Sequence, residues 1–535
     1  MKNLLYSIAS GLLLWLSWPT YGFAGFLFIA FIPLLLLERN LRTTGAAKAG
    51  KKVWLYAYLA FVIWNFATTY WLYFSTPFGM FFAVLVNALL MSLVFLGYHF
   101  IAKKTSQGAA LSFLVSFWIL FEYLHLNWEF SWPWLNLGNG FSENVNWVQW
   151  YEYTGTFGGS LWIWAVNVTL FLWWSRFRES ENKSTRSIYK GLFLATIFVA
   201  LPLIISIAIK PDLSKTDQST AKNVLIVQPN VDPYDEKFYQ DNNSVVDSLI
   251  VMLEPVINEE TDIVITPETM LAADLRITQI ERDDAIKNLK GYFTQFPKTS
   301  YLGGVSLLDV YTDPSRKTTQ TNTHTDGRTF YDLYNSALFF NPEQPLELYH
   351  KSKLVVGVEN FPYKSILEPL LGDVMLDMGG TSATKTTQKE RANFRLIDST
   401  AVAPIICYES VYGEYVTGYV DNGAQFLAVI TNDGWWEETQ GHKQHLSLSR
   451  LRAIENRRYV ARSANTGISA IINSNGEIIK SLGYNKKGIL SGTIIPQNEM
   501  TFYATHGDYI VRIAAFIAIF TFLFSVLKKG TMKRK

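Results

Sequence analysis

Residues 403–409 read APIICYE, an apolar run that ends at the only cysteine of the chain, Cys407. The β-branched isoleucines predict a buried strand, and the polar residues from Tyr408 onward predict its end. One thiol cannot form a disulfide within its own chain. Cys407 is therefore either a small buried side chain, as most free cysteines are, or a chemical group. Both interpretations stay open on this residue alone.

Similar short runs surround this strand in the sequence. Apolar segments with β-branched residues, bounded by turn residues, recur at 223–231, 261–268, 300–308, 335–341, 425–433, 467–476 and 488–495. Several are continuously apolar, which is typical of strands covered on both faces. Candidate helices lie at 244–258 and 445–461, whereas 311–330 is polar and lacks helix or strand signals. Residues 211–508 are therefore predicted to form a layered α/β domain.

The rest of the chain has longer apolar runs. A composition of 49% hydrophobic and 15% aromatic residues is rich for a soluble protein of 535 residues. Eight runs approach the length of about 20 residues that a membrane-spanning helix needs, at 3–17, 23–38, 53–73, 78–102, 110–127, 159–175, 191–209 and 509–527. No small-residue cleavage site follows the first run, so it is interpreted as a retained span. We expect seven transmembrane helices in 1–210, the α/β domain in 211–508, and an eighth helix with a basic tail in 509–535.

The distribution of basic residues predicts the orientation of these spans, because Lys and Arg near span ends stay in the cytoplasm. Basic clusters occupy the loops 39–52, 103–104 and 176–190 and the tail 528–535, while the alternate loops 18–22, 74–77 and 128–158 contain no Lys or Arg. Both ends of the chain are thus predicted to be cytoplasmic and the α/β domain to lie outside. The net charge of +2 carries no information in sum, and nothing in its distribution suggests nucleic-acid binding.

Chemically useful groups fall at the ends of three predicted strands. These groups are Glu268, Cys407 with Glu409, and Asn432. Ligands gather at the carboxyl ends of strands in open α/β sheets, because loops converge there. A further group, Lys351, stands in the segment YHKSKLV at 349–355.

These groups suit a nucleophilic cysteine. A thiol with a pKa of about 8.5 is mostly protonated at neutral pH, so it needs a base or a neighbouring cation. Glu268 can take the proton, and Lys351 can stabilise the thiolate and the charge that develops on an attacked carbonyl. Each also has an ordinary alternative, Glu268 as the first residue of a helix and Lys351 as a solvated charge. Lys353 is the nearby rival for Lys351.

Histidine and glycine patterns point to no further cofactor. His442 and His445 have a spacing that can bind a metal, but no other His or Cys cluster completes such a site. We interpret them as polar packing or substrate-loop residues and expect no metal. Gly303 and Gly304 are interpreted as a turn at a strand end rather than a phosphate loop.

Five of these segments together resemble the nitrilase superfamily. They are IVITPET at 263–269, YHKSKLV at 349–355, IICYES at 405–410, AVITNDGWW at 428–436 and RLRAIENRRYVARSANTGISA at 450–470. The resemblance implies an α-β-β-α sandwich with a Glu, Lys and Cys triad. With the eight spans, the pattern is similar to the apolipoprotein N-acyltransferase family over nearly the whole chain. Supporting segments are GLLLWLSWP at 11–19, WPWLNLG at 132–138 and HGDY at 506–509.

The resemblance assigns roles residue by residue. The general base falls on Glu268, the lysine on Lys351 and the nucleophile on Cys407. Supporting or substrate-binding residues are expected at Glu359, Tyr408, Glu409, Asn432, Trp435 and Trp436. One segment departs from the family pattern, because many members read LVPFGE where this chain reads LVVGVE at 354–359. The loop after the lysine is therefore expected to differ in shape.

The function implied by the resemblance is acyl transfer without a cofactor. A phospholipid would donate an acyl chain to the thiol, which would pass it to the α-amino group of an S-diacylglyceryl cysteine at a lipoprotein N-terminus. The resemblance also implies a bacterial inner membrane, with the catalytic domain facing the periplasm. Two alternatives remain open, namely a membrane-anchored amidase of the nitrilase type and a non-catalytic lipid transport or assembly protein.

Overall fold

The computed structural model describes residues 1–179, 185–215, 217–234, 236–237, 239–364, 366 and 383–532. The chain divides into two compact units. The helical unit comprises Met1–Tyr73, Phe78–Lys210 and His506–Lys535, and the sheet unit comprises Phe74–Pro77 and Pro211–Thr505.

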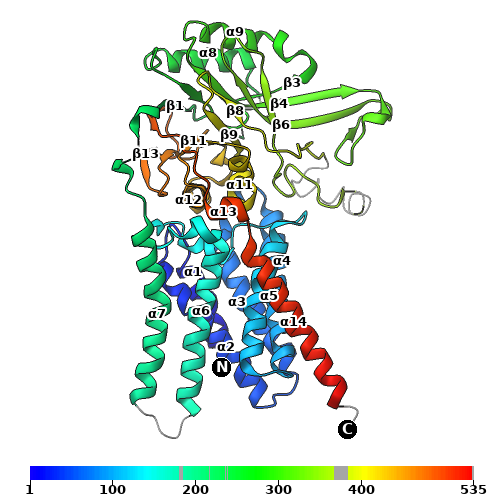
Figure 1. The fold of residues 1–535 in the computed structure, drawn as a ribbon. Coiled ribbons are helices and arrows are strands. Elements are labelled where there is room, and N and C mark those ends of the chain that lie inside the picture. Colours follow the sequence, from blue (N-terminus) through cyan, green and yellow to red (C-terminus); the bar gives the residue numbers. More distant parts are fainter. Residues whose placement is uncertain are drawn as a thin grey trace. The chain divides into compact units, whose positions relative to one another are not determined.

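Long helices dominate the described part of the helical unit (Figure 1). They are α1 Lys2–Leu16, α2 Ile32–Thr43, α3 Ala49–Thr69, α4 Pro77–Ala102, α5 Gln107–Leu126, α6 Tyr151–Glu179, α7 Thr185–Ile209 and α14 Tyr509–Met532. The segment predicted as a loop at 128–158 is partly helical, because it contains the 3-10 helices η3 Leu137–Phe141 and η4 Val145–Trp147 and the first residues of α6.

Six stretches of the described chain are long and apolar enough to cross a membrane. They are Ala24–Thr43, Pro77–Ala102, Gln107–Leu126, Tyr151–Arg178, Gly191–Lys215 and Tyr509–Leu527. The other two predicted spans are helical but fall outside this set. Helix α1 has only 15 residues, and α3 includes Asn65, Thr68 and Thr69 beside its apolar side chains. The count of eight spans therefore stays a prediction.

Several of these helices expose large apolar side chains, above all α7 and α14. Ile207 in α7 is 71% exposed, and Phe516 and Phe520 in α14 are 72% and 64% exposed. Such side chains are unfavourable in water and ordinary against lipid tails. The exposed surfaces of α7 and α14 thus fit a membrane-embedded protein.

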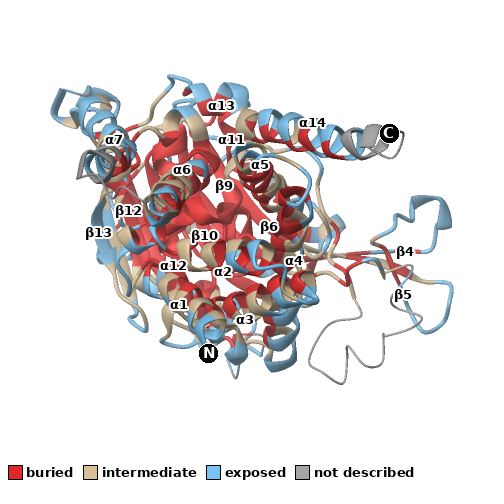
Figure 2. Ribbon diagram, turned by 90° about the horizontal axis from the view of Figure 1, so that it is seen from below, coloured by how far each residue is buried: buried red, intermediate tan, exposed pale blue. Residues whose placement is uncertain are grey.

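The sheet unit contains two stacked sheets. The described strands of the first sheet are β1 Lys222–Gln228, β2 Ile263–Ile265, β3 Leu271–Arg276, β4 Ser300–Tyr311, β5 Asn322–Thr323, β6 Phe330–Phe340, β7 Glu347–His350 and β14 Gly488–Ile494. Those of the second are β8 Phe394–Arg395, β9 Ala401–Ile406, β10 Phe426–Thr431, β11 Val460–Ala464, β12 Ser469–Ile472 and β13 Ile478–Leu482. Strands β9 and β10 lie in the buried interior (Figure 2).

Helices cover the outer face of each sheet, which confirms the predicted α-β-β-α arrangement (Figure 1). Helices α8 Asn242–Leu253 and α9 Asp284–Phe293 pack their apolar faces on the first sheet. Asp241 and Asp283 cap them by accepting hydrogen bonds from backbone N–H groups of the first turn. Helices α11 Gly413–Asp421 and α12 Gln440–Asn456 pack on the second sheet.

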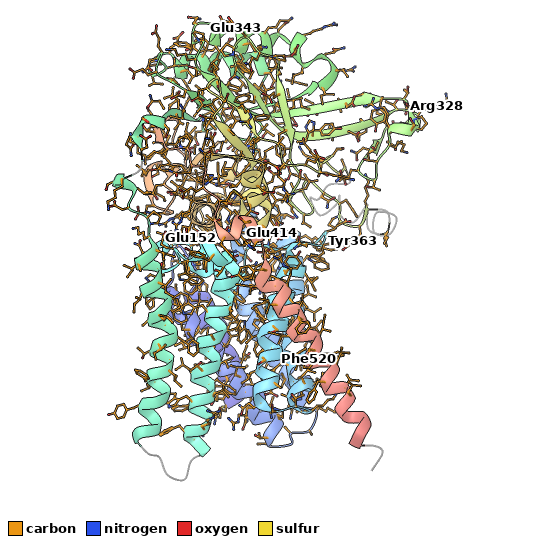
Figure 3. All side chains as sticks on the ribbon, viewed as in Figure 1. Glu152, Arg328, Glu343, Tyr363, Glu414 and Phe520 are labelled. Atoms are coloured by element: carbon orange, nitrogen blue, oxygen red, sulfur yellow. The ribbon has the colours of Figure 1, made fainter. Side chains whose placement is uncertain are left out.

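Three details differ from the sequence prediction. The helix expected at 445–461 begins earlier and ends at Asn456, because Arg457 has a left-handed backbone with φ 48°. The segment 311–330 contains the short strand β5, which pairs with β6 at the end of a long hairpin near Arg328 (Figure 3). Gly303 and Gly304 lie inside β4 rather than at a strand end.

Parallel pairing brings the functional ends of strands together. In the first sheet β2 lies parallel to β1 and β4, and in the second β10 lies parallel to β9 and β11. The carboxyl ends of parallel strands meet at one edge of a sheet. The segments that follow β2, β9 and β10 carry Glu268, Cys407 and Asn432, respectively.

Candidate active site

Cys407, the expected nucleophile, stands on a sharp turn. Strand β9 ends at Ile406, and Cys407 opens the 3-10 helix η9 Cys407–Val411 with a left-handed backbone, φ 48°. A residue with a Cβ atom is rarely found in this conformation. The Glu409 carboxylate accepts a hydrogen bond from Ile406 N at 2.9 Å, and Ser410 Oγ donates to the carbonyl oxygen of Cys407 at 2.7 Å. The turn is therefore held on both sides of the cysteine.

Glu268 lies on the segment after β2 and is almost fully buried. Its Oε1 atom accepts hydrogen bonds from Lys351 Nζ at 2.9 Å and Asn335 Nδ2 at 2.7 Å, and its Oε2 atom accepts from Asn432 N at 3.2 Å. Gly304 permits this placement, because a Cβ there would lie 2.6 Å from Glu268 Cα. This close approach explains why a glycine stands inside β4.

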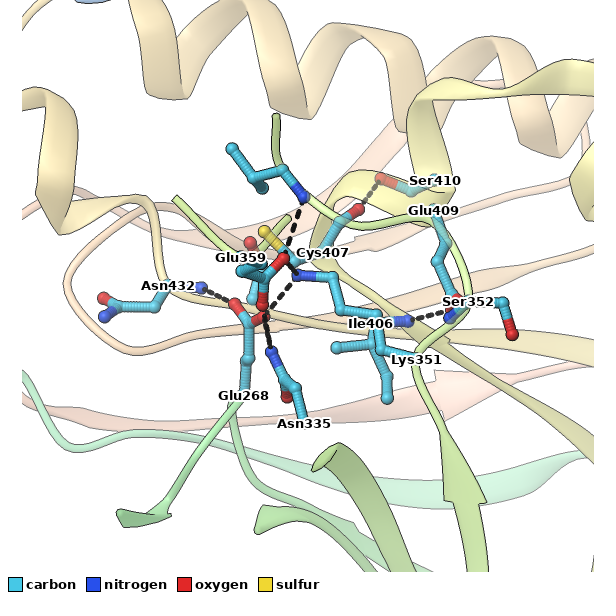
Figure 4. Close-up of polar contacts among 12 residues, drawn as sticks. Glu268, Asn335, Lys351, Ser352, Glu359, Ile406, Cys407, Glu409, Ser410 and Asn432 are labelled. Carbon is cyan, nitrogen blue, oxygen red and sulfur yellow. Dashed lines mark hydrogen bonds and ion pairs between the residues drawn. The ribbon is translucent and has the colours of Figure 1, made fainter. Parts of the chain in front are cut away.

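Lys351 links two buried carboxylates. It follows β7, and its backbone N–H donates to Asn335 O at 2.8 Å. Its Nζ atom lies 2.9 Å from Glu268 Oε1 and 2.8 Å from Glu359 Oε2 (Figure 4). Asn335 Nδ2 also donates to Glu359 Oε1 at 2.8 Å, so it bridges the same two carboxylates. Although the sequence around Glu359 departs from the family pattern, the structure brings this residue to Lys351.

Burial and charge set the ionisation of these groups. Burial alone would lower the pKa of Lys351, but Glu268 and Glu359 raise it well above its ordinary value. Burial alone would raise the pKa of Glu359, but Lys351 and Lys385 lower it to about 2. Lys351 and Glu359 are therefore a charged pair across the neutral pH range.

The Cys407 thiol is protonated in this arrangement. Its side chain lies beside Lys351 (Figure 4). Burial and the Glu268 charge raise the pKa of the thiol, whereas Lys351 and a hydrogen bond with Thr431 oppose the rise. A neutral thiol beside a carboxylate and an ammonium group can pass its proton to the carboxylate without changing the net charge of the site.

Glu409 is the centre of a separate buried network. Its Oε1 atom accepts hydrogen bonds from Ser352 N and Tyr349 Oη, both at 2.7 Å. Tyr415 Oη and Tyr419 Oη add bonds at 3.1 Å each. Glu409 thereby ties the turn after Cys407 to the residue that follows Lys351. The Glu409 carboxylate itself is directed away from the Cys407 sulfur (Figure 4).

The other expected site residues lie at the second sheet. Asn432 contributes its backbone N–H to Glu268, while its side-chain Oδ1 accepts from Asn465 Nδ2 at 3.1 Å. Trp435 packs edge-on against Tyr234, with ring centroids 5.1 Å apart. Trp436 packs against His445 at 5.7 Å, and Tyr408 packs against Tyr412 at 5.3 Å. Binding of an acyl chain by Trp435, Trp436 or Tyr408 remains a prediction.

The contacts of Asn335 and Lys237 with Glu268 were not predicted from the sequence. Lys237 is buried, and its Nζ donates to the backbone oxygen of Glu268 at 2.8 Å. Burial lowers the pKa of Lys237 to about 8, although the negative charge of Glu268 opposes this shift. The signal for Asn335 was a polar residue at the start of the apolar run 335–341. A lone lysine in a loop gave no comparable signal.

Three side chains of the site are close enough to hold a cation. Cys407, Asp433 and His445 each place one potential donor atom within 4.8 Å of the others. Asp433 already accepts hydrogen bonds from Arg462 Nη2 at 2.6 Å and Thr431 Oγ1 at 2.8 Å. The Arg462 charge disfavours a divalent ion at this position. We therefore interpret the cluster as a hydrogen-bonded network.

Two parts of the chain match known protein families. Residues 10–169 match the apolipoprotein N-acyltransferase N-terminal domain, and residues 316–500 match the carbon-nitrogen hydrolase family. Among solved structures, a nitrilase-superfamily protein of Saccharomyces cerevisiae is similar with a TM-score of 0.36 and 15% identity, over 52% of this chain and 91% of that protein.

Relatives extend the match over nearly the whole chain. An apolipoprotein N-acyltransferase of Chlorobaculum tepidum is 26% identical over 538 residues, which cover 99% of this chain and 97% of the relative. Those of Geobacter metallireducens and Thermotoga maritima are 25% and 24% identical, cover 95% and 99% of this chain, and are themselves covered over 92% and 95% of their length. The chain is thus a bacterial membrane protein that is similar over nearly its whole length to apolipoprotein N-acyltransferases.

Proposed function

We propose that this acyltransferase moves a fatty acyl chain from a phospholipid to the α-amino group of an S-diacylglyceryl cysteine at the N-terminus of a lipoprotein. The observation that carries the proposal is the contact of Lys351 with both Glu268 and Glu359 beside the Cys407 thiol. The apolar helices support it, because both substrates are anchored in a bilayer by their acyl chains.

In the first half-reaction Cys407 is the nucleophile and Glu268 the general base. The thiol proton moves to Glu268, and the sulfur attacks the ester carbonyl of the phospholipid. Lys351 is well placed to stabilise the negative charge that develops on the carbonyl oxygen, because both carboxylates keep it charged. The ester C–O bond breaks, the lysophospholipid alcohol takes the proton from Glu268, and a thioester remains on Cys407.

The second half-reaction reverses these roles. The amine of the diacylglyceryl cysteine attacks the thioester carbonyl, and Glu268 accepts the proton that the amine loses. The C–S bond breaks, the sulfur leaves as a thiolate, and Glu268 returns the proton to it. The products are an N-acylated lipoprotein and free enzyme. No oxidant, metal or cofactor enters the atom balance.

The side of the membrane on which this chemistry occurs is also part of the proposal. We place the sheet unit on the periplasmic side of the inner membrane. The loops 39–52, 103–104 and 176–190 and the tail 528–535 are basic, which places them in the cytoplasm and the sheet unit on the opposite side. The sheet unit is continuous in sequence with α7 on one side and α14 on the other. It is thus tethered to the bilayer at both ends.

A reconstituted reaction tests the function. The purified full-length protein in detergent micelles is incubated with a phospholipid and a synthetic S-diacylglyceryl lipopeptide, and the lipopeptide mass is followed. We expect the mass to rise by one amide-linked acyl chain, and Cys407→Ala and Cys407→Ser to abolish the change. Intact-protein mass spectrometry without the lipopeptide should detect an acyl thioester on Cys407. Transfer by Cys407→Ala would contradict the mechanism.

The alternatives predict different results in the same experiment. A nitrilase-type amidase would release ammonia from simple amides in the absence of lipid. A non-catalytic lipid transport or assembly protein would bind phospholipid without forming a thioester. Either result, with no acylated lipopeptide, would replace the proposed function.

A further inference from the structure

A buried polar cluster lies behind the nucleophile at the second sheet. It contains Ser410 in η9, Asp433 in the 3-10 helix η10 Asp433–Trp436, His445 in α12 and Arg462 in β11, all with buried side chains. His445 Nδ1 is 2.8 Å from Asp433 Oδ1, and Arg462 Nη2 donates to Asp433 Oδ2 at 2.6 Å. On the other side of the ring, His445 Nε2 lies 2.9 Å from Ser410 Oγ and 3.3 Å from the carbonyl oxygen of Cys407. The cluster thus runs from β11 to the backbone of the nucleophile.

The hydrogen bonds assign a proton to Nε2 of His445. Ser410 Oγ gives its only proton to the Cys407 carbonyl at 2.7 Å, so toward His445 it can only accept. The carbonyl oxygen can also only accept, so with Ser410 bonded to the carbonyl Nε2 is the donor to both oxygens. The short Nδ1 contact with Asp433 favours a second proton, whereas the 3.1 Å contact of Arg462 Nη2 with Nδ1 favours an unprotonated Nδ1, and burial and Arg462 lower the pKa of His445. With this Ser410 hydrogen bond, Nε2 carries a proton in either state.

This assignment decides what His445 can do. Its ring lies close to the thiol, since a ring nitrogen is within 4.8 Å of Cys407 Sγ. A nitrogen that already carries a proton and donates it to the Cys407 carbonyl and Ser410 cannot accept the thiol proton. His445 is thus unsuited to be the base of a Cys-His pair, and that role stays with Glu268. Its contact is with the backbone of the nucleophile.

The backbone of Cys407 needs such a contact. Its left-handed conformation, with φ 48°, is disfavoured for a residue with a side chain, and glycine cannot replace a thiol. Strained conformations persist when the surroundings hold them in place. Ser410 and His445 both bind the Cys407 carbonyl, while Glu409 binds the preceding N–H group of Ile406. These three side chains hold both ends of the turn.

We propose that His445 is a positioning residue for acyl transfer, which together with Ser410 locks the turn that aims the Cys407 thiol at the acyl carbonyl. Asp433 and Arg462 hold the imidazole ring in this position. The inference rests on the proposed function, since positioning is measured through acylation of the thiol. This positioning role differs from metal binding, because a metal bound to the Cys407 sulfur would prevent the thiol from attacking the acyl carbonyl.

Two uncharged substitutions separate positioning from general support of the fold. In His445→Gln the longer amide side chain can place an N–H near the position of Nε2, whereas in His445→Asn the shorter amide reaches only the position of Nδ1 near Asp433. We expect His445→Asn to lower kcat about 100-fold with KM little changed, since small misplacements cost this much. His445→Gln should retain about tenfold more activity than His445→Asn. Equal losses in the two variants, or losses confined to KM, would overturn the proposal.

The alkylation rate of Cys407 provides a readout that needs no lipid. Iodoacetamide reacts with the thiol, so its rate should follow the order of wild type, His445→Gln and His445→Asn. His442→Gln is a matched control on the same helix, because the His442 ring stacks on Tyr484 at 4.4 Å. We expect this control to keep kcat and the alkylation rate within about twofold of wild type. A loss in the control as large as that in His445→Asn would overturn the assignment.

Ser410→Ala keeps the proposal testable if His445→Asn does not fold. It removes one of the two donors to the Cys407 carbonyl, and we expect about a tenfold loss of kcat at unchanged KM. A kcat equal to that of wild type would overturn the proposal. Wild-type transfer in the same preparation separates the two hypotheses. If wild type fails to transfer, the proposed function fails, whereas unaffected His445 and Ser410 variants beside an active wild type reject only this inference.

Discussion

The two sheets of the sandwich contribute unlike halves of the site. The first sheet and the loop after it supply ionised groups, with Lys351 between Glu268 and Glu359. The second sheet supplies a neutral thiol, Cys407, on a turn fixed by hydrogen bonds. The first half thus contributes charged side chains and the second half a left-handed backbone at the cysteine, and the proposed mechanism uses both. The difference suggests that damage to the first half removes chemistry, while damage to the second half misplaces it.

Backbone N–H groups of each half form hydrogen bonds to the other half. Asn432 N from the second sheet donates to Glu268 Oε2 at 3.2 Å. Ser352 N, next to Lys351 in the chain, donates to Glu409 Oε1 at 2.7 Å. The carboxylate of each half therefore accepts a backbone N–H from the other half. Substitutions of the charged groups should have the largest effects, because they leave a buried partner uncompensated.

The largest effect is expected for Lys351→Met. It leaves Glu268 and Glu359 buried without their shared cation, which typically costs roughly 3–5 kcal/mol of stability. Loss of the oxyanion contact should also lower acyl transfer about 1,000-fold. Thermal unfolding and lipopeptide acylation measure the two effects. Lys353→Met is the matched control, because Lys353 stacks over Tyr412 at 4.9 Å rather than joining the carboxylates, and equal losses in both variants would contradict the assignment.

Glu268→Gln tests the proposed general base, which belongs to the charged half of the site. The amide keeps the size of the side chain but cannot accept the thiol proton, so acyl transfer should fall roughly 100- to 10,000-fold. Acylation of the lipopeptide measures the loss. Transfer by Glu268→Gln at the wild-type rate would contradict the assignment of Glu268 as the base.

A smaller effect, on the stability of the fold, is expected from the pH dependence of the Glu359 charge. Its pKa falls from 4.5 to about 2 on folding, with Lys351 and Lys385 overcoming the effect of burial. A carboxyl group with a depressed pKa in the folded state contributes stability that is complete above about pH 4.5 and is lost progressively as the pH falls toward 2. Glu359→Gln should therefore lower the thermal midpoint more at pH 6 than at pH 3. An equal drop at both values would show that the Glu359 charge adds no stability.

Some residues of the site could be predicted from the sequence. Glu268 and Cys407 occur in short motifs after apolar runs, and parallel pairing brings such strand ends together. Lys351 was singled out as a charged group in the segment 349–355. The layered α/β domain was predictable because continuous β-branched runs indicate strands covered on both faces, whereas the two-sheet arrangement was expected from the family resemblance. Helix α12 was predicted too far along the chain, since the left-handed Arg457 that ends it gives no periodic signal.

Residues that act through distant partners could not be predicted. Asn335 joins two carboxylates only because β6 pairs antiparallel with β4 and β7, a register that the sequence does not specify. His445 was interpreted as packing or a substrate-loop residue, and its contacts with Ser410 and the Cys407 carbonyl span 35 and 38 positions of the chain. The periodicity of apolar residues indicates local secondary structure only. These hydrogen-bond networks depend instead on how the two sheets and helix α12 pack against one another.

The smallest effect is expected for single tyrosines around Glu409 in the hydrogen-bonded half. Tyr419→Phe removes one bond of 3.1 Å to Glu409 Oε2, whereas Tyr349→Phe removes one of 2.7 Å to Oε1 and the 2.7 Å hydrogen bond between the Tyr349 and Tyr415 hydroxyls. Each should cost about 1 kcal/mol, with the larger loss for Tyr349, because Glu409 keeps the backbone donors Ile406 N and Ser352 N. Thermal unfolding measures the cost, and acyl transfer should change less than about threefold. If Tyr419→Phe instead reduced transfer as strongly as Glu268→Gln, the tyrosines would belong to the chemical half of the site, and the division between charge and positioning would fail.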